Sequence, residues 1–295
     1  MYRIFLVLSY LSILTACGTL RADVNLRWLT TDSSLPPLLS SYLSRSNVIP
    51  DFVRMVDENF VFEQPLTLEL GIGELPHYNR ASNSIVIPFS YLERAAFTQS
   101  VVSSEIDSGE SEELDVDANA NAVAVFEYTL YHLLGHSLVA NANAIADSTV
   151  EALSSYIMIA YWPNGAEKWA TAIQAYGNAS QKLNGPLDDY WHTHQLFKER
   201  QNTIECWILG SEVALMAMAE GDKLLEQDRL PEGESLSEIE SALPQKGGSL
   251  MHAQAEREKI ERCRDSWNNL VEAAQLLLEP FLLSDSPLGR PLSLR

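Results

Sequence analysis

Apolar and polar residues follow two different periods along this chain, and the periods predict its strands and helices. Runs with a period of two at 66–70 and 84–88 predict two strands, and the turn residues between Tyr78 and Asn83 join them into a β-hairpin. Apolar residues spaced three and four apart predict helices at 51–60, 90–98, 126–138, 144–161, 166–176, 190–220 and 249–283. The sequence therefore predicts an α+β fold that is mostly helical, with a small N-terminal β-hairpin packed on the helical core.

Polar stretches between these elements predict the organisation of the domain. Residues 17–49 are rich in Ser, Leu and Pro, which predicts a tether with at most a short helix and a folded domain over 50–295. Residues 105–117 carry many carboxylates and no basic residue, which predicts an acidic, mobile surface loop. Residues 221–248 are polar and contain Pro and Gly, which predicts a surface excursion.

The N-terminus has the pattern of an export signal. Arg3 precedes an apolar run, 4–14, that is too short to span a bilayer. The run ends in Leu14-Thr15-Ala16-Cys17, which resembles the lipobox of bacterial lipoproteins and implies that residues 1–16 are removed and Cys17 is lipidated. Gly18 is not an Asp that would retain the protein at the inner membrane. We therefore expect a lipid anchor in the bacterial cell envelope, facing the periplasm from the outer membrane. The alternative is an ordinary signal peptide with an incidental Cys17.

The net charge limits the possible binding partners, and the cysteines indicate the cellular compartment. A formal net charge of -20 argues against a nucleic-acid partner, because the chain has no basic stripe to neutralise phosphates. Besides Cys17 the chain has Cys206 and Cys263, and an oxidising periplasm favours a disulfide between them. Closing that loop stabilises the fold by about 4 kcal/mol on a chain-entropy estimate. Two buried free thiols are the alternative.

The segment with the clearest chemistry is His132-Leu133-Leu134-Gly135-His136. Two histidines four apart on a helix lie on one face, so both imidazoles can reach one zinc ion. The active motif of zinc peptidases, His-Glu-x-x-His, has a general base after its first histidine. That position here is Leu133, which cannot accept a proton.

Further residues are candidates for the rest of a metal site. Asp147 and Glu151, four apart on the next predicted helix, are candidates for a third zinc ligand beside His132 and His136. A substitute base would have to come from Glu127, Glu151 or His194. The sequence therefore assigns no catalytic residue. Zinc is the expected cofactor if these residues form a metal site.

Taken in order, several segments resemble the DUF4344 family of metallopeptidases over residues 60–283. The segments are Pro76-His77-Tyr78, the motif 132–136, Ala146-Asp147, His194 with Arg200, Cys206 with Gly210, Cys263 with Trp267, and the apolar end 276–281. The resemblance implies a metallopeptidase-like helical core. The chain departs from the family at Leu133 and at 141–145, where the family has an acidic run that would supply the third zinc ligand.

Three functions are consistent with this pattern. The first is a catalytically degenerate metallopeptidase-like lipoprotein, a pseudoenzyme that binds or scaffolds a protein or peptide partner in the cell envelope. The second is a zinc-dependent peptidase with a non-standard base. The third is a structural lipoprotein without metal, in which His132 and His136 are core residues bonded to Tyr128, Asp147 or the backbone.

Overall fold

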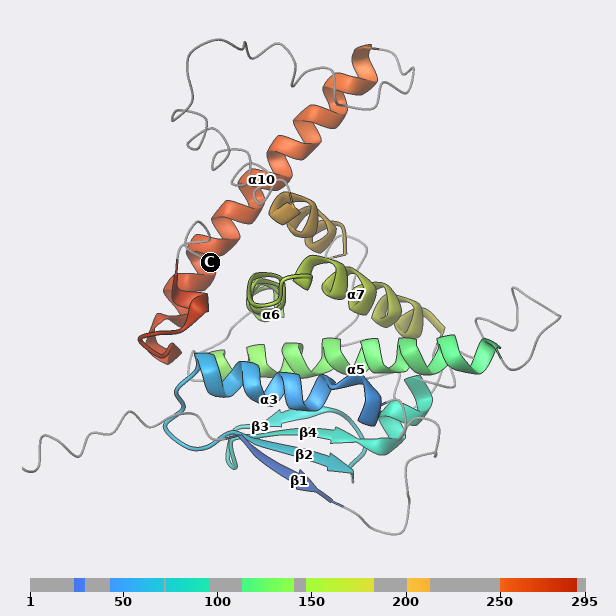
Figure 1. The fold of residues 1–295 in the computed structure, drawn as a ribbon, viewed down its shortest axis with the longest axis vertical. Coiled ribbons are helices and arrows are strands. Elements are labelled where there is room, and N and C mark those ends of the chain that lie inside the picture. Colours follow the sequence, from blue (N-terminus) through green and yellow to red (C-terminus); the bar gives the residue numbers. More distant parts are fainter. Residues whose placement is uncertain are drawn as a thin grey trace, which may run out of the picture.

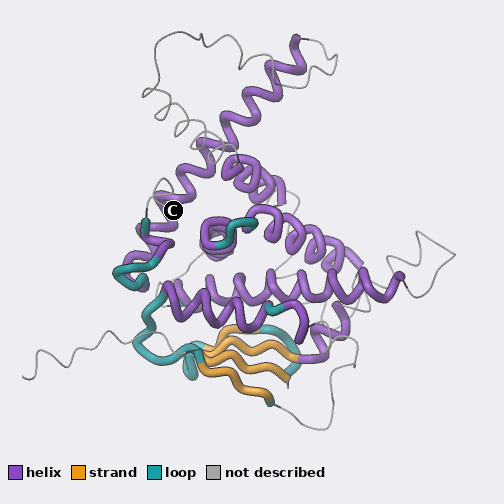
Figure 2. The backbone as a smooth tube through the Cα atoms, viewed as in Figure 1, coloured by secondary structure: helices purple, strands orange, loops and turns teal. Residues whose placement is uncertain are grey.

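The structure, a computed structural model, describes residues 24–29, 43–71, 73–95, 113–140, 147–182, 201–212 and 250–290. A small sheet lies at one end, and helices are stacked on it in successive layers (Figure 1). Strands are confined to that sheet, while helices make up most of the described chain (Figure 2). The predicted mostly helical α+β fold is confirmed.

The sheet has four strands in the order β1-β2-β4-β3. They are β1 (Asn25–Trp28), β2 (Thr67–Gly71), β3 (His77–Asn79) and β4 (Ser84–Pro88). Strand β4 lies between two partners: it runs parallel to β2 and antiparallel to β3. The predicted strands at 66–70 and 84–88 are therefore present, but the prediction that they form a hairpin with each other is wrong. The tight turn before β4 reverses the chain from β3, which the sequence analysis did not identify as a strand.

The prediction that residues 17–49 form a tether is wrong where the structure has strand β1. This strand pairs parallel with β2, with Leu26 opposite Leu68 and Trp28 opposite Leu70. Residues 43–46 are helical, and α3 begins at Val48. The domain start predicted at residue 50 is therefore too late. Strand β1 alternates Leu26 and Trp28 with Asn25 and Arg27, but it has only four residues, all exposed at the sheet edge, and this short alternation was not interpreted as a strand.

Register places the apolar side chains of the sheet on one face. Leu68, Leu70, Ile85 and Ile87 share this face and are almost completely buried. Helices α3 (Val48–Asn59) and α5 (Glu113–Val139) lie over the sheet (Figure 1), and their side chains belong to the same core cluster. Burial of this shared apolar face stabilises the packing of α3 and α5 on the sheet.

Helix α5 is the centre of the molecule. It is covered by α6 (Asp147–Tyr161) and α7 (Gly165–Lys182) on the side away from the sheet (Figure 1). The predicted acidic loop at 105–117 is wrong in its last part, because α5 already begins at Glu113, and residues 105–112 lie outside the described ranges. The predicted break at 162–165 is present as a turn between α6 and α7.

The C-terminal helix α10 (Leu250–Leu278) is joined to the helical residues 201–212 by the disulfide Cys206–Cys263, with a Cα–Cα distance of 4.8 Å. The predicted disulfide is confirmed. The predicted helix to residue 283 ends instead at 278, and the short 3-10 helix η2 (Glu279–Phe281) follows.

The chain beyond η2 returns to the N-terminal helix. Phe60 forms a bridge with Leu282, and the Leu283 amide donates to the Asn59 carbonyl at 2.9 Å. Ser286 Oγ donates to Asn59 Oδ1 at 2.7 Å. The next turn, η3 (Pro287–Gly289), buries Leu288 completely. These contacts, which we call the C-terminal clamp (residues 281–289 on 59–61 and α6), join the C-terminal end of the described chain to the end of α3.

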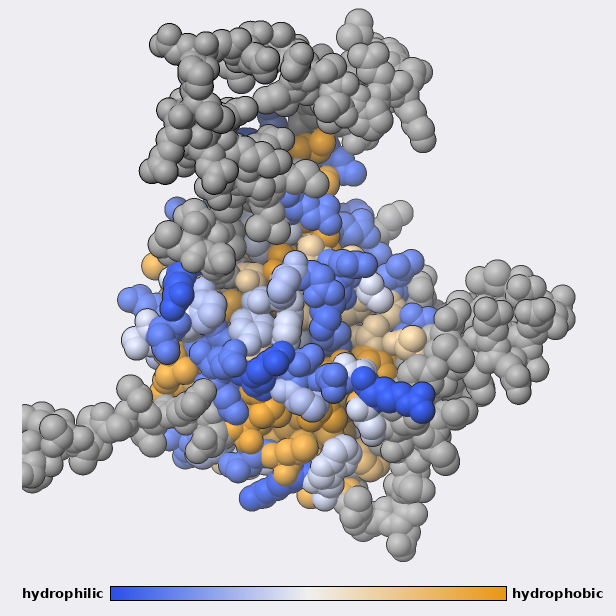
Figure 3. Space-filling view, viewed as in Figure 1, coloured by the Kyte–Doolittle hydropathy of each residue, from blue (hydrophilic) through white to orange (hydrophobic). Residues whose placement is uncertain are grey.

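The surface is polar over much of the helical layers, and hydrophobic residues gather near the sheet on the face seen in Figure 3. Among the described residues the exposed large hydrophobic side chains are Leu26, Trp28, Leu276 and Leu277. None of the described helices is both long and apolar enough to cross a membrane. The predicted signal peptide, Cys17, His194 and the excursion 221–248 lie outside the described ranges.

Candidate metal centre

His132 and His136 lie one turn apart on α5 and meet side by side. Their Nε2 atoms are 3.2 Å apart, and their rings are almost perpendicular, at 80°. His132 is 2% exposed, whereas His136 is half-buried. The helical spacing that the sequence predicted therefore brings the two imidazoles together.

The separation of the two nitrogens fits the donor set of a zinc ion. Zn–N bonds of about 2.0–2.1 Å in a tetrahedral site place two nitrogen ligands roughly 3.3–3.4 Å apart. The 3.2 Å between the two Nε2 atoms is close to that edge. The pair thus fits two corners of a tetrahedral site.

The other corners are not filled by a third protein ligand in the described part of the chain. No group of three or more His, Cys, Asp or Glu side chains lies together there in a way that could hold a metal ion. Asp147 is half-buried at the first residue of α6. Its predicted role as a ligand stays a prediction, as does that of His194 as a base.

Glu151 lies on the far side of the His132 ring from His136. Its Oε1 is 3.2 Å from His132 Nδ1 and accepts a hydrogen bond from the Tyr128 hydroxyl at 2.7 Å. Glu151 is 3% exposed, so this carboxylate is buried against the histidine. This contact is made by Nδ1, and not by the Nε2 atom that contacts His136, and its geometry is not that of a hydrogen bond.

Gly135 lets α6 come close enough for this contact. A Cβ atom at Gly135 would lie 2.8 Å from Ser154 Oγ and 2.9 Å from Val150 Cγ1. Ser154 Oγ also lies 3.0 Å from the Tyr131 carbonyl, which it reaches as a donor. Val150 and Ser154 flank Glu151 on α6, so the close approach at Gly135 holds the carboxylate beside His132.

Aromatic rings form a wall beside the site. Tyr128 stacks on His132 with ring centroids 5.8 Å apart and on Trp169 at 5.2 Å. It also contacts Tyr176 at 4.1 Å. Trp169 is completely buried and donates to Ser155 Oγ at 2.9 Å. The stack fixes Tyr128, and through it one side of the histidine ring.

Leu133, at the position of the missing base, is 2% exposed and belongs to the hydrophobic core cluster. An apolar, buried side chain there can neither accept a proton nor hold a water molecule. The position next to His132 is therefore used for packing.

Glu127, another candidate base, is bound elsewhere. Its Oε1 is 3.2 Å from Lys168 Nζ, and Lys168 also lies over the Trp162 ring, 4.7 Å from its centroid. Burial raises the pKa of Glu127, and Lys168 lowers it by a smaller amount. The sequence did not predict this pair, because the two residues are 41 positions apart and no pattern links them.

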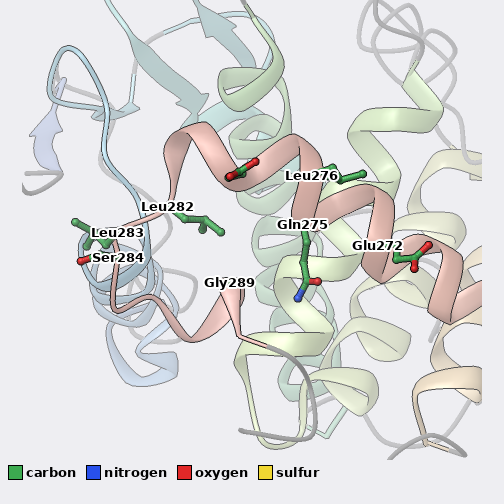
Figure 4. Close-up of a pocket in the computed structure, with 8 residues that line it drawn as sticks. Glu272, Gln275, Leu276, Leu282, Leu283, Ser284 and Gly289 are labelled. Carbon is green, nitrogen blue, oxygen red and sulfur yellow. The ribbon is translucent and has the colours of Figure 1, made fainter.

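The hollow drawn in Figure 4 lies away from the histidines. It has a volume of about 790 Å³ between α10 and the C-terminal turns, and it is lined by Glu272, Gln275, Leu276, Glu279, Leu282, Leu283, Ser284 and Gly289. None of these residues contributes to the cluster around His132. The site is therefore defined by the side chains on α5 and α6 and not by this hollow.

Comparison with known proteins gives one match. The family model DUF4344, described as "Putative metallopeptidase", matches residues 34–237, which includes the histidine motif and all of α5, α6 and α7. No curated protein and no solved structure matches the chain.

Proposed function

This chain belongs to the DUF4344 family of metallopeptidase-like proteins, and from that premise we propose that it retains a two-histidine metal-binding frame without the chemistry of peptide hydrolysis. Its function would then be binding or scaffolding of a protein or peptide in the cell envelope. The observation that carries the proposal is the burial of Leu133 in the core at the position of the general base, beside an intact histidine pair.

The partners of the nearby carboxylates support the loss of hydrolysis. A general base must reach the attacking water within about 3 Å. Glu151 is engaged by the Tyr128 hydroxyl and lies against His132 Nδ1, on the opposite side of the ring from His136. Glu127 is paired with Lys168. Both carboxylates are engaged by other groups, which argues against the alternative of a peptidase with a substitute base.

The histidine pair supports retained binding. Nε2 of His132 and Nε2 of His136 would hold the zinc ion, which supplies a Lewis acid with open coordination positions. Half-burial of His136 leaves this side of the pair accessible. A carboxylate or imidazole of a bound protein or peptide is the ligand type that suits such a position.

A lipid anchor at Cys17 is the second part of the proposal. It would place the domain at the periplasmic face of the outer membrane, close to envelope partners. The support is the lipobox-like segment 14–17, together with a disulfide that is typical of exported proteins.

The test is metal content and hydrolysis in the same preparation. The domain from residue 19, made without a His tag, is compared with a His132→Ala/His136→Ala variant by mass spectrometry, and both are incubated with an unfolded protein substrate. We expect zinc near one equivalent that is lost in the variant, and no zinc-dependent cleavage by either protein. Cleavage that requires the histidines would contradict the loss of catalysis, and absence of zinc in both proteins would contradict the metal-binding frame.

A further inference from the structure

The hollow of Figure 4 combines an exposed leucine with carboxylates and shares no residue with the candidate metal centre. We infer that it is a docking surface for a basic, leucine-containing helix of another protein. Leu276 is the apolar contact, and Glu272 and Glu279 are the charged contacts. The surface is separate from the histidine pair and does not depend on metal, so the inference goes beyond the proposed function.

The exposed side of α10 changes in character near its C-terminal end. The buried residues of the helix are apolar and lie three and four apart: Trp267, Leu270, Ala274 and Leu278. The exposed positions between 258 and 272 are all charged or polar, as expected for a solvated helix face. Leu276 departs from this pattern, because it is 73% exposed and lines the hollow.

The opposite wall of the hollow is held in place by hydrogen bonds. The Leu283 amide donates to the Asn59 carbonyl at 2.9 Å, and Gln275 Nε2 donates to the Arg290 carbonyl at 3.2 Å. Leu282 and Leu283 are half-buried in this wall and add apolar surface to the hollow. Because the wall is already fixed, little ordering of this surface opposes the binding of a partner.

The charges around the hollow favour a cationic partner. Glu272 and Glu279 lie about one turn before and one turn after Leu276, and both are exposed. The described residues that line the hollow include no Lys or Arg. Residues 272–290 contain three carboxylates and one cation, Arg290, whose Nη2 donates to a backbone carbonyl. A leucine between two carboxylates is complementary to an apolar side chain between basic residues one helical turn apart.

The same charges argue against a second copy of this chain as the occupant. A second copy brings a formal net charge of -20 and, in a two-fold contact, the same pair of carboxylates. Like charges that face each other across an interface weaken binding. The occupant is therefore a different protein, with basic residues on the face that contacts the hollow.

The experiment measures the binding of helical peptides to the full chain in nanodiscs of zwitterionic lipid by fluorescence anisotropy. The probe is a labelled Ala-based peptide with leucines on one face and lysines one turn before and after them. A second peptide has Glu in place of Lys, and a third has Ser in place of Leu. Empty nanodiscs report binding to lipid, and a metal chelator makes the result independent of zinc.

Two variants test the surface, and each has a matched control. Leu276→Ser removes the apolar contact, and its control is Leu277→Ser, because that leucine is exposed on the same helix and is not among the described residues of the lining. Glu272→Gln/Glu279→Gln removes two charges, and Glu258→Gln/Glu261→Gln removes two exposed charges from earlier turns of α10. All these positions are exposed, so the variants should fold.

We expect the wild type to bind the leucine–lysine peptide in preference to the other two peptides. Leu276→Ser should weaken this binding about tenfold, as is typical of a central apolar contact. Glu272→Gln/Glu279→Gln should weaken it about 3–10-fold. The two controls should bind the peptide like the wild type.

Three results would overturn the inference. If the wild type binds the leucine–lysine peptide no better than the Glu peptide, the hollow does not select basic residues. If Leu276→Ser binds the peptide like the wild type, binding belongs to the acidic surface in general. If sedimentation shows a dimer of the wild type that is lost in Leu276→Ser, the occupant is a second copy.

Discussion

Glu127 on α5 and Glu151 on α6 are both buried, and they differ in their partners. Glu151 is bound by a neutral hydroxyl and lies against a histidine nitrogen. Glu127 is bound by the cation of Lys168. The ion pair with Lys168 compensates part of the cost of burying the Glu127 charge, whereas Tyr128 brings no such compensating charge to Glu151.

The pH dependence of stability should reveal Glu127. Its pKa is raised from 4.5 in the folded state, with burial as the larger cause. The folded protein therefore binds this proton more readily than the unfolded chain, so the contribution of Glu127 to stability is present below pH 4.5 and is lost as pH rises through the folded pKa.

Glu127→Gln should remove this contribution. Urea unfolding between about pH 4 and about pH 7 should give a free energy of unfolding that falls less with rising pH in the variant than in the wild type. Parallel curves for the two proteins would show that the carboxyl titrates alike in the folded and unfolded states.

At the scale of elements, the site depends on how closely α5 and α6 pack. Gly135 is a position of close approach between the two helices, and Glu151 contacts His132 from α6 nearby. Glycine here is needed for lack of a side chain and not for backbone freedom, because it lies within a continuous helix.

Gly135→Ala should therefore destabilise the domain although alanine favours helices. The gain in helix propensity is about 1 kcal/mol, while forced overpacking costs about 1–3 kcal/mol. Displacement of Ser154 and Val150 adds to the cost, so we expect a net loss on the order of 1–2 kcal/mol in urea unfolding.

The control is Gly177→Ala on α7. There the nearest atom to a new Cβ would be Gln201 Oε1 at 3.9 Å, an ordinary contact. This variant should be neutral or more stable by up to about 1 kcal/mol. Equal effects of the two substitutions would mean that α6 does not limit the space at Gly135.

Helical periodicity predicted α5, α6 and α7 because each buries a wide apolar surface. It missed β1, whose residues are exposed and whose pairing depends on a strand 42 positions later, as in Asn25 opposite Thr67. The histidine pair could be predicted from spacing alone. The side of the ring that Glu151 contacts could not, because it depends on how two helices are rotated against each other.

At the scale of the whole molecule, the part of the chain beyond the family match completes the core. The match ends at residue 237, yet Trp267 and Leu288, which follow it, are both almost completely buried. Tyr156 on α6 lies 6.3 Å from the Trp267 ring and donates to the Leu288 carbonyl at 2.7 Å. A fragment cut at the end of the match would expose this part of α6.

The disulfide should contribute strongly to the free energy of unfolding of this domain. Cys206 and Cys263 are 57 residues apart in sequence. The chain-entropy model gives about 4 kcal/mol for a loop of that length, and native bridges typically contribute about 2–5 kcal/mol. Cys206→Ser/Cys263→Ser should lower the free energy of unfolding by an amount in this range, measured in urea.

Reductant provides the matched comparison. It should destabilise the wild type to the level of the double serine variant and leave that variant unchanged. A wild type that unfolds at the same urea concentration with and without reductant would show that the bridge adds no net stability.

The C-terminal clamp also has a consequence for how the protein is made. Ser286 and Asn59, which bond to each other, are 227 positions apart. A chain that leaves the ribosome or crosses a membrane from its N-terminus presents Asn59 well before Ser286. The C-terminal end of helix α3 is therefore covered only after those intervening residues have followed, and until then the buried side of Phe60 is open to a chaperone or to aggregation.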